Sequence, residues 1–132
     1  MISTTTRQIV LDTETTGMNK LGVHYEGHRI IEIGAVEVIN RRLTGRNFHV
    51  YIKPDRLVDP EAYGVHGISD DFLADKPTFD QVADEFLDFI RGGELVIHNA
   101  AFDIGFMDHE FRMLQQGIPK TETFCTITDS LL

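Results

Sequence analysis

The order in which strand and helix patterns follow one another constrains the fold of this chain more than any other feature. Three strand patterns come first, and two helix patterns then alternate with two further strand patterns, over residues 8–14, 29–40, 46–53, 79–90, 94–98, 101–116 and 123–127. Strands joined by short links pair antiparallel, whereas a helix between two strands favours a parallel crossover. The order therefore predicts an α/β fold with a mixed five-stranded sheet flanked by helices.

The first helix pattern, over residues 79–90, is the best defined. Its apolar side chains recur on one helical stripe. Thr78 and Gln81 fit a capping box at its start, and Gly92 with Gly93 ends it. We therefore expect a helix that packs one apolar side against the sheet.

The remaining segments give weaker predictions. The short link 41–45 predicts an antiparallel hairpin between the second and third strands. Segment 54–77 contains Pro, Gly and Asp, which predicts an irregular connection with one or two short helical turns. The residues from 129 onward predict the start of another helix.

Composition excludes several other classes of protein. The single cysteine, Cys125, rules out an intramolecular disulfide and hence a disulfide-framed secreted module. No apolar run approaches the roughly 18–20 residues of a membrane span, and the N-terminus lacks the pattern of a signal peptide. We therefore expect a soluble cytoplasmic protein without a membrane partner.

The charge of the chain bears on its partners. The net charge of −9 argues against broad electrostatic binding to nucleic acid, although bound divalent cations can supply the positive charge that phosphates need. Many of the acids lie between Asp70 and Asp88. We interpret this run as a solvated helix face, with a docking surface for a basic partner as the alternative.

Two acids end the first strand pattern. Asp12 and Glu14 are two residues apart, so their side chains project from the same face of a strand. Such a pair suits Mg²⁺, which takes one or two carboxylates together with phosphate oxygens. The alternative is a solvated strand end with two ordinary acids. The Thr-Thr-Gly sequence that follows favours the metal site, because it lets backbone amides approach a ligand closely.

A third acid follows a second strand pattern. Asp103 lies in the first turn of the predicted helix 101–116, where an acid also interacts favourably with the helix dipole. Open α/β sheets bind ligands at strand ends, so two acidic sites at two such ends favour one shared metal centre. His66, between Gly64 and Gly67, is predicted to lie in a loop, either exposed to a ligand or bonded locally.

At this point two motifs become recognisable. The sequence IVLDTETTG at residues 9–17 resembles the first motif of the DEDD exonuclease superfamily, and HNAAFD at 98–103 resembles the second. The stretches 23–38, 53–69 and 96–111 extend the likeness. Almost the whole chain resembles the N-terminal exonuclease domain of the proofreading epsilon subunits of bacterial DNA polymerase III.

This resemblance implies a ribonuclease-H-like fold and 3′→5′ removal of nucleotides from a single-stranded or frayed DNA end, with two Mg²⁺ or Mn²⁺ ions. The acids that it implies for metal binding and catalysis are Asp12, Glu14 and Asp103. The residues that it implies for binding the terminal nucleotide are Asp12, Glu14, Thr15, Glu61, His66 and Phe102. It also implies two protein partners, the theta subunit of the polymerase core and the polymerase alpha subunit.

The sequence departs from the family after Asp103. The third motif of the family, H-x-x-x-x-D, supplies the general base and the fourth acid, and no such pair occurs there. His109 is followed five residues later by Leu114. We therefore expect residues 1–132 to be a C-terminally incomplete exonuclease domain with weak or no activity alone. The tail by which the family binds the alpha subunit is also missing.

Two alternatives stay open. A related exoribonuclease, resembling oligoribonuclease, would use the same acids, because the choice of sugar is not readable from these motifs. A non-catalytic fragment that binds a partner of the replicative polymerase would explain the absence of the third motif.

Overall fold

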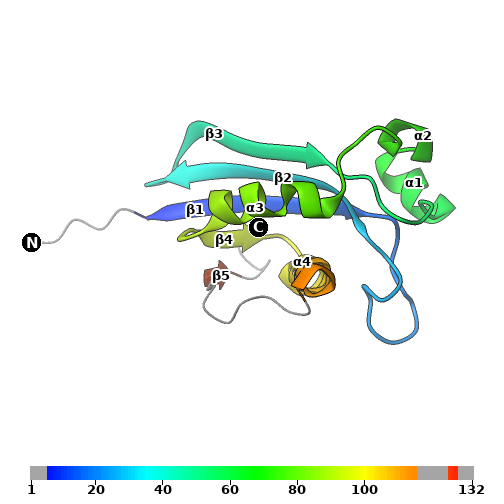
Figure 1. Ribbon diagram of the computed structural model, residues 1–132. Helices are drawn as coiled ribbons and strands as arrows, with labels where there is room; N and C mark the ends of the chain where they lie inside the picture. The colour runs from blue at the N-terminus through cyan, green and yellow to red at the C-terminus, as the bar shows by residue number, and fades with distance from the viewer. Residues whose placement is uncertain (1–5, 116–124, 128–132) are drawn as a thin grey trace, which may run out of the picture.

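The mixed sheet is the centre of the structure. The computed structural model describes residues 6–115 and 125–127. Its elements are β1 (Arg7–Thr15), β2 (Ile30–Ile39), β3 (Arg42–Tyr51), α1 (Pro60–His66), α2 (Asp70–Leu73), α3 (Phe79–Ile90), β4 (Glu94–Ile97), α4 (Ala100–Gln115) and β5 (Cys125–Ile127). The strand order is β3-β2-β1-β4-β5 (Figure 1). The first three strands pair antiparallel, and β4 pairs parallel with β1 and β5. The predicted α/β fold is confirmed.

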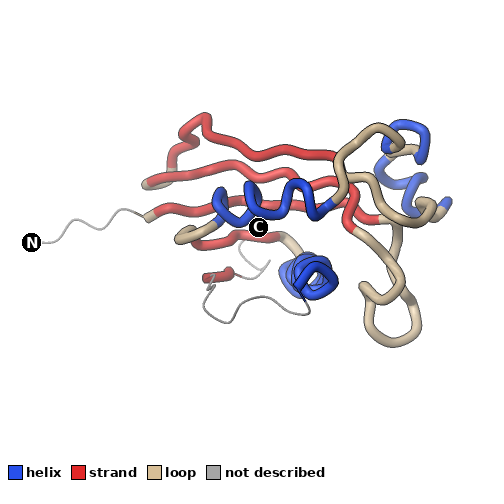
Figure 2. Tube along the Cα trace, in the orientation of Figure 1, coloured by secondary structure: helices blue, strands red, loops and turns tan. Residues whose placement is uncertain are grey.

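One face of the sheet forms the main core. Along β1 the side chains alternate, so that Ile9, Leu11 and Thr13 are buried on one face while Asp12 is exposed on the other. The buried face packs against α3 and α4 in a single apolar cluster. A smaller cluster lies under α1 and α2, which sit with the long loops at one end of the sheet (Figure 2). The helices therefore cover one face and one end.

Helix α3 follows its sequence pattern closely. The Gln81 side chain accepts a hydrogen bond from the Thr78 backbone N–H at 3.0 Å, and both interactions of the predicted capping box are present. Gly92 has a φ of 78°, a left-handed conformation that ends the helix. The acids of α3 are exposed (Asp80, Asp84, Glu85 and Asp88), so the helix presents a solvated acidic face.

The hairpin differs from its prediction in the position of the turn. The antiparallel pairing is confirmed, but β3 already begins at Arg42. The turn consists of Asn40 and Arg41 alone, with φ of 51° and 70°. Two consecutive left-handed residues match the twist of a two-residue hairpin. An arginine gives no sequence signal for that conformation, so the prediction placed the link too late.

The segment 54–77 confirms its prediction, since it holds the two short helices α1 and α2. The predicted helix from residue 129 lies outside the described residues. Across the part of the chain that is described, no helix is both long and apolar enough to cross a membrane.

The turn generates a prediction about stability. Replacing Arg41 by Gly removes the steric cost of a left-handed residue that bears a side chain, and the Arg41 side chain that is lost is exposed. We expect Arg41→Gly to raise the free energy of unfolding by roughly 0.5–1 kcal/mol, measured by urea denaturation. The matched control, Arg42→Gly, weakens a strand residue and should lower it. A gain for Arg42→Gly, or a loss for Arg41→Gly, would contradict this account of the turn.

Candidate functional site

The site begins where β1 ends. Asp12 and Glu14 project from the open face of the sheet, as predicted, and Asp12 is exposed while Glu14 is partly buried. Residue Leu11 pairs with Ile97 across the parallel β1–β4 ladder. The C-terminal ends of β1 and β4 therefore lie side by side, and α4 starts just beyond β4.

Asp103 lies in the first turn of α4, with 3% of its surface exposed. The Thr13 hydroxyl donates a 2.6 Å hydrogen bond to its Oδ1. Burial raises the pKa of Asp103 to about 6, and the charges of Asp12 and Glu14 act in the same direction, while the Thr13 hydrogen bond opposes them. The three acids thus lie close enough to repel one another.

Glu14 is perturbed in the same direction. Burial raises its pKa, and so do the neighbouring Asp12 and Glu32 charges, whereas His66 lowers it. Glu32 lies directly opposite Glu14 in the β1–β2 ladder. Like charges on facing strands are destabilising, so this strand end favours a cation between its acids.

The donor set suits a divalent cation. All three groups are carboxylates, the ligands that hard cations such as Mg²⁺ prefer. Within the described residues, however, no three His, Cys, Asp or Glu side chains form a group that could hold an ion as placed. The described arrangement has Asp103 hydrogen-bonded to Thr13. Holding one ion with all three acids therefore requires Asp103 to turn from that hydroxyl or to act through water.

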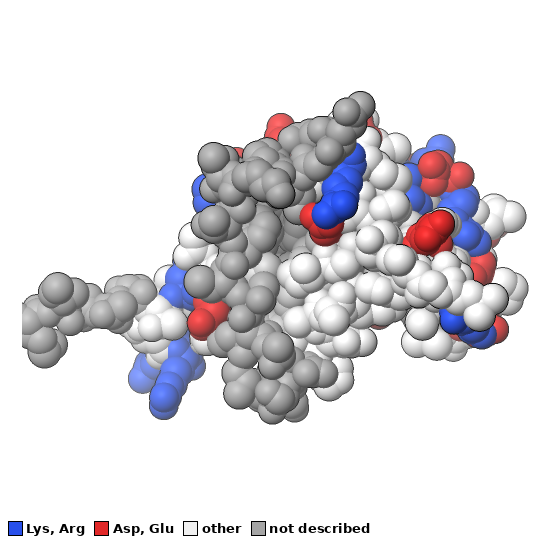
Figure 3. Space-filling model, turned by 90° about the horizontal axis from the view of Figure 1, so that it is seen from below, with Lys and Arg blue, Asp and Glu red and all other residues white. Residues whose placement is uncertain are grey.

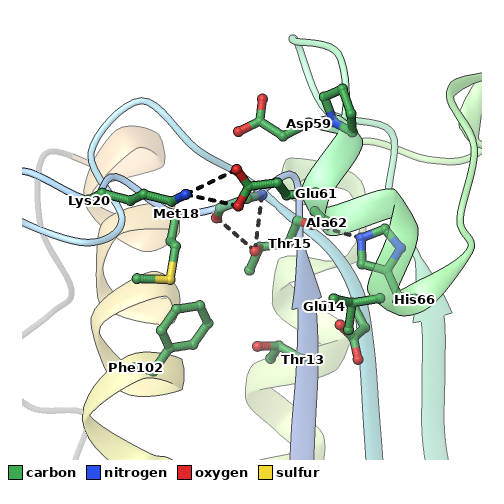
Figure 4. Close-up of a pocket in the computed structure, with 13 residues that line it drawn as sticks. Thr13, Glu14, Thr15, Met18, Lys20, Asp59, Glu61, Ala62, His66 and Phe102 are labelled. Carbon is green, nitrogen blue, oxygen red and sulfur yellow. Dashed lines mark hydrogen bonds and ion pairs between the residues drawn. The ribbon is translucent and has the colours of Figure 1, made fainter.

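A cavity of about 580 Å³ adjoins these acids (Figure 4). It brings together five of the predicted site residues from β1, α1 and α4, namely Glu14, Thr15, Glu61, His66 and Phe102. Asp12 does not line it. Asp12 lines a neighbouring hollow on the open sheet face, with Gly34, His49 and His98. Glu14 and Asp12 therefore line two different hollows, and Asp103 lines neither of them.

The backbone around Thr15 shapes the cavity floor. Thr15 is buried, and its hydroxyl donates to the Gly17 carbonyl at 2.8 Å. Gly17 has a φ of 148°, and a Cβ there would lie 2.6 Å from Asp59 Oδ2. A side chain at position 17 would be strained at this φ and would displace Asp59 and His28, which explains the glycine after the two threonines.

His66 was predicted to lie in a loop. The structure instead places it as the last residue of α1. Proline at position 60 starts this helix and a left-handed Gly67 ends it, so the glycine acts as a helix terminator. Because His66 Nδ1 accepts from the Ile68 N–H at 3.0 Å, its Nε2 carries the proton and donates to the Thr15 carbonyl at 3.1 Å. Both ring nitrogens are thus engaged, and the ring faces the cavity.

Phe102 and the loop between β1 and β2 complete the wall. His24 stacks on the Phe102 ring, with centroids 5.1 Å apart, and its Nε2 contacts the Phe102 carbonyl at 3.1 Å. Met18, Lys20 and Val65 also line the cavity and were not predicted. Met18 and Lys20 lie in the loop between β1 and β2, and Val65 lies on the short helix α1, so no periodic sequence pattern predicts them.

His98, which follows β4, is exposed. His98 is close enough to Asp103 for its charge to lower the pKa of that acid.

Comparison with known proteins defines the class. The family model described as exonuclease, of the RNase T type, matches residues 9–131, and the chain belongs to this exonuclease family. The fold is also that of exonuclease I. The E. coli enzyme in complex with a dT13 oligonucleotide has a TM-score of 0.76 at 16% identity, over 93% of this chain and 28% of that chain. The enzyme from Methylocaldum szegediense has a TM-score of 0.75 at 17% identity, over 93% and 27%.

More similar relatives share the sequence itself. The chain is 78% identical over 131 residues to DNA polymerase III subunit epsilon of Escherichia coli K12, covering 99% of this chain and 54% of that protein. It is 68% identical over 126 residues to the subunit of the same name from Pasteurella multocida, covering 96% and 49%. The chain thus spans about half the length of the curated relatives it matches. The resemblance to epsilon subunits is confirmed.

The raised pKa of Asp103 predicts a pH dependence of stability. On folding its pKa rises from 3.8 to about 6. Its contribution is therefore fully present below pH 3.8 and is lost as the pH rises through 6. Asp103→Asn stays neutral and can still accept from Thr13. We expect this variant to match the parent near pH 4 and to be more stable at pH 7, by up to roughly 3 kcal/mol.

Urea denaturation at several pH values, without divalent cations, measures this difference. Asp84→Asn, on the exposed face of α3, is the matched control and should show no such trend. A stability difference between Asp103→Asn and the parent that is constant from pH 4 to pH 7 would show that burial does not perturb Asp103.

Proposed function

We propose that residues 1–132 form the greater part of the exonuclease domain of a proofreading polymerase subunit, which acts on 3′ ends of DNA in the cytoplasm. One observation carries the proposal. The carboxylates of Asp12, Glu14 and Asp103 lie close enough to repel one another, and Glu14 also lines the cavity of about 580 Å³. The membership of the exonuclease family and the identity to epsilon subunits support the same activity.

Asp12, Glu14 and Asp103 are proposed to hold two divalent cations, Mg²⁺ or Mn²⁺. Bound there, the cations would neutralise the charge that builds up on the phosphate and lower the pKa of the attacking water. The role of the protein residues is to place the acids. Thr13 donates a hydrogen bond to Asp103 that favours its ionised form, and β1 keeps Asp12 and Glu14 on one face.

The cavity is proposed to take the terminal nucleotide. Met18, Val65 and Phe102 offer an apolar surface for the base. His66 has both ring nitrogens engaged, so it presents its ring face rather than a donor. The Glu61 carboxylate, in the first turn of α1, is the acceptor for the 3′-hydroxyl.

The residues after Asp103 do not supply the general base that the family uses. The sequence after Asp103 contains no histidine five residues before an aspartate. A positioned base contributes about 10²–10⁴-fold to such a reaction. We therefore propose that the 132-residue chain hydrolyses DNA slowly, and that a longer chain with an H-x-x-x-x-D pair hydrolyses it faster. Binding of a theta subunit is proposed from the family resemblance, and binding of the alpha subunit is proposed only for a longer protein that carries the family's polymerase-binding tail.

We expect Asp12→Ala and Glu14→Ala each to reduce hydrolysis by at least roughly 100-fold, because loss of either acid weakens the cation site that stabilises the transition state. The assay is Mg²⁺-dependent shortening of a 5′-labelled single strand, in which a ladder of products shows removal from the 3′ end. It is run on the 132-residue chain and on the longer chain.

Asp84→Ala, an exposed acid on α3, is the control and should retain activity. A parallel RNA strand distinguishes an exoribonuclease. Near-parental hydrolysis by either site variant at millimolar Mg²⁺ would refute the cation assignment, and equal activity of the short and long chains would refute the role of the missing pair.

A further inference from the structure

An ion pair crosses the outer side of the cavity. Lys20 Nζ lies 3.0 and 2.9 Å from the two carboxylate oxygens of Glu61 (Figure 4). Lys20 comes from the loop between β1 and β2, and Glu61 comes from α1. Their side chains are 68% and 79% exposed, whereas Thr15 on the cavity floor is buried. The pair therefore lies where a ligand enters.

Stabilisation of the loop does not account for this pair. An exposed ion pair contributes little to folding stability. The loop has other anchors, since the Asn19 N–H donates to the His24 carbonyl at 2.8 Å and His24 contacts the Phe102 carbonyl. Among the described residues that line the cavity, Lys20 is the one lysine or arginine. At this end of the molecule opposite charges lie next to one another (Figure 3), as in the Arg56–Asp59 pair.

The hydrogen-bonding capacity of the pair is only partly used. An ammonium group has three N–H donors, and two of those of Lys20 point to Glu61. A carboxylate has about four lone-pair sites, and Lys20 takes two of those on Glu61. The pair thus offers one donor and free acceptor sites next to each other.

A hydroxyl group is the ligand that uses both, because it donates one hydrogen bond and accepts another. We propose that Lys20 is a specificity-determining residue that recognises the free 3′-hydroxyl of the strand together with Glu61. The hydroxyl donates to Glu61 and accepts from Lys20. This inference rests on the proposed function, in which the cavity holds the terminal nucleotide. An end without the hydroxyl engages neither group.

Two nucleotides that differ only at the 3′ position test the proposal. Thymidine 5′-monophosphate and its 3′-deoxy analogue are titrated with Mg²⁺ into the ¹⁵N-labelled 132-residue chain, and amide shifts give Kd for each. The measured quantity is the Kd of the 3′-deoxy analogue divided by the Kd of thymidine 5′-monophosphate. For Lys20→Met we expect this ratio to fall roughly 2- to 10-fold, the effect of one hydrogen bond, with the Kd of the 3′-deoxy analogue unchanged.

Two variants serve as controls. Lys53→Met changes an exposed lysine outside the cavity and should keep the parental ratio. Lys20→Arg keeps a cationic donor and should keep most of the parental ratio of Kd values. Amide spectra establish that each variant is folded.

The outcomes separate the inference from the proposed function. If the parent shows no shifts of cavity amides with thymidine 5′-monophosphate, the proposed function itself fails. If the parent binds and Lys20→Met keeps the parental ratio, the inference alone fails. If Lys20→Met weakens the binding of both nucleotides equally, the inference also fails, because Lys20 then only shapes the cavity.

Discussion

Repulsion among three carboxylates is the constraint on which this structure depends. The negative charges of three acids at the end of β1 repel one another, in a region partly shielded from water. The acids are Asp12, Glu14 and Asp103. Such an arrangement is unfavourable unless the acids are protonated, hydrogen-bonded or neutralised by a cation. The remainder of the fold holds them there. β1 lies inside the sheet, between β2 and β4, so its end is fixed on both sides.

The position of α4 depends on a second buried acid. Glu110 is fully buried and accepts hydrogen bonds from the Arg29 guanidinium and from the Ile30 backbone N–H at 2.8 Å. This pair ties α4 to the start of β2, and α4 carries Asp103 in its first turn. Breaking a buried pair by removing one partner typically costs about 3–5 kcal/mol. A distant ion pair thus fixes the acid that completes the site.

The sequence predicted elements that depend on local periodicity and missed features that depend on distant contacts. The apolar stripe defined α3, and the two-residue spacing of Asp12 and Glu14 defined their shared face. The partnership of Thr13 with Asp103 joins residues 90 positions apart, and no spacing rule reaches that far. Lys20 was missed for the same reason, because its partner Glu61 lies 41 residues away. Short helical turns were predicted for this segment, but the place of His66 at the end of one was missed because its flanking glycines favoured a loop.

The central claim is that the three carboxylates form one shared centre that binds divalent cations. The most direct measurement is paramagnetic broadening of amide signals by substoichiometric Mn²⁺ in the ¹⁵N-labelled chain. The acidic face of α3, with Asp80, Asp84 and Asp88, is an internal competitor of similar charge. The account predicts that broadening centres on residues 12–15 and 99–103. Broadening that instead centres on α3, or spreads evenly over all exposed acids, would contradict it.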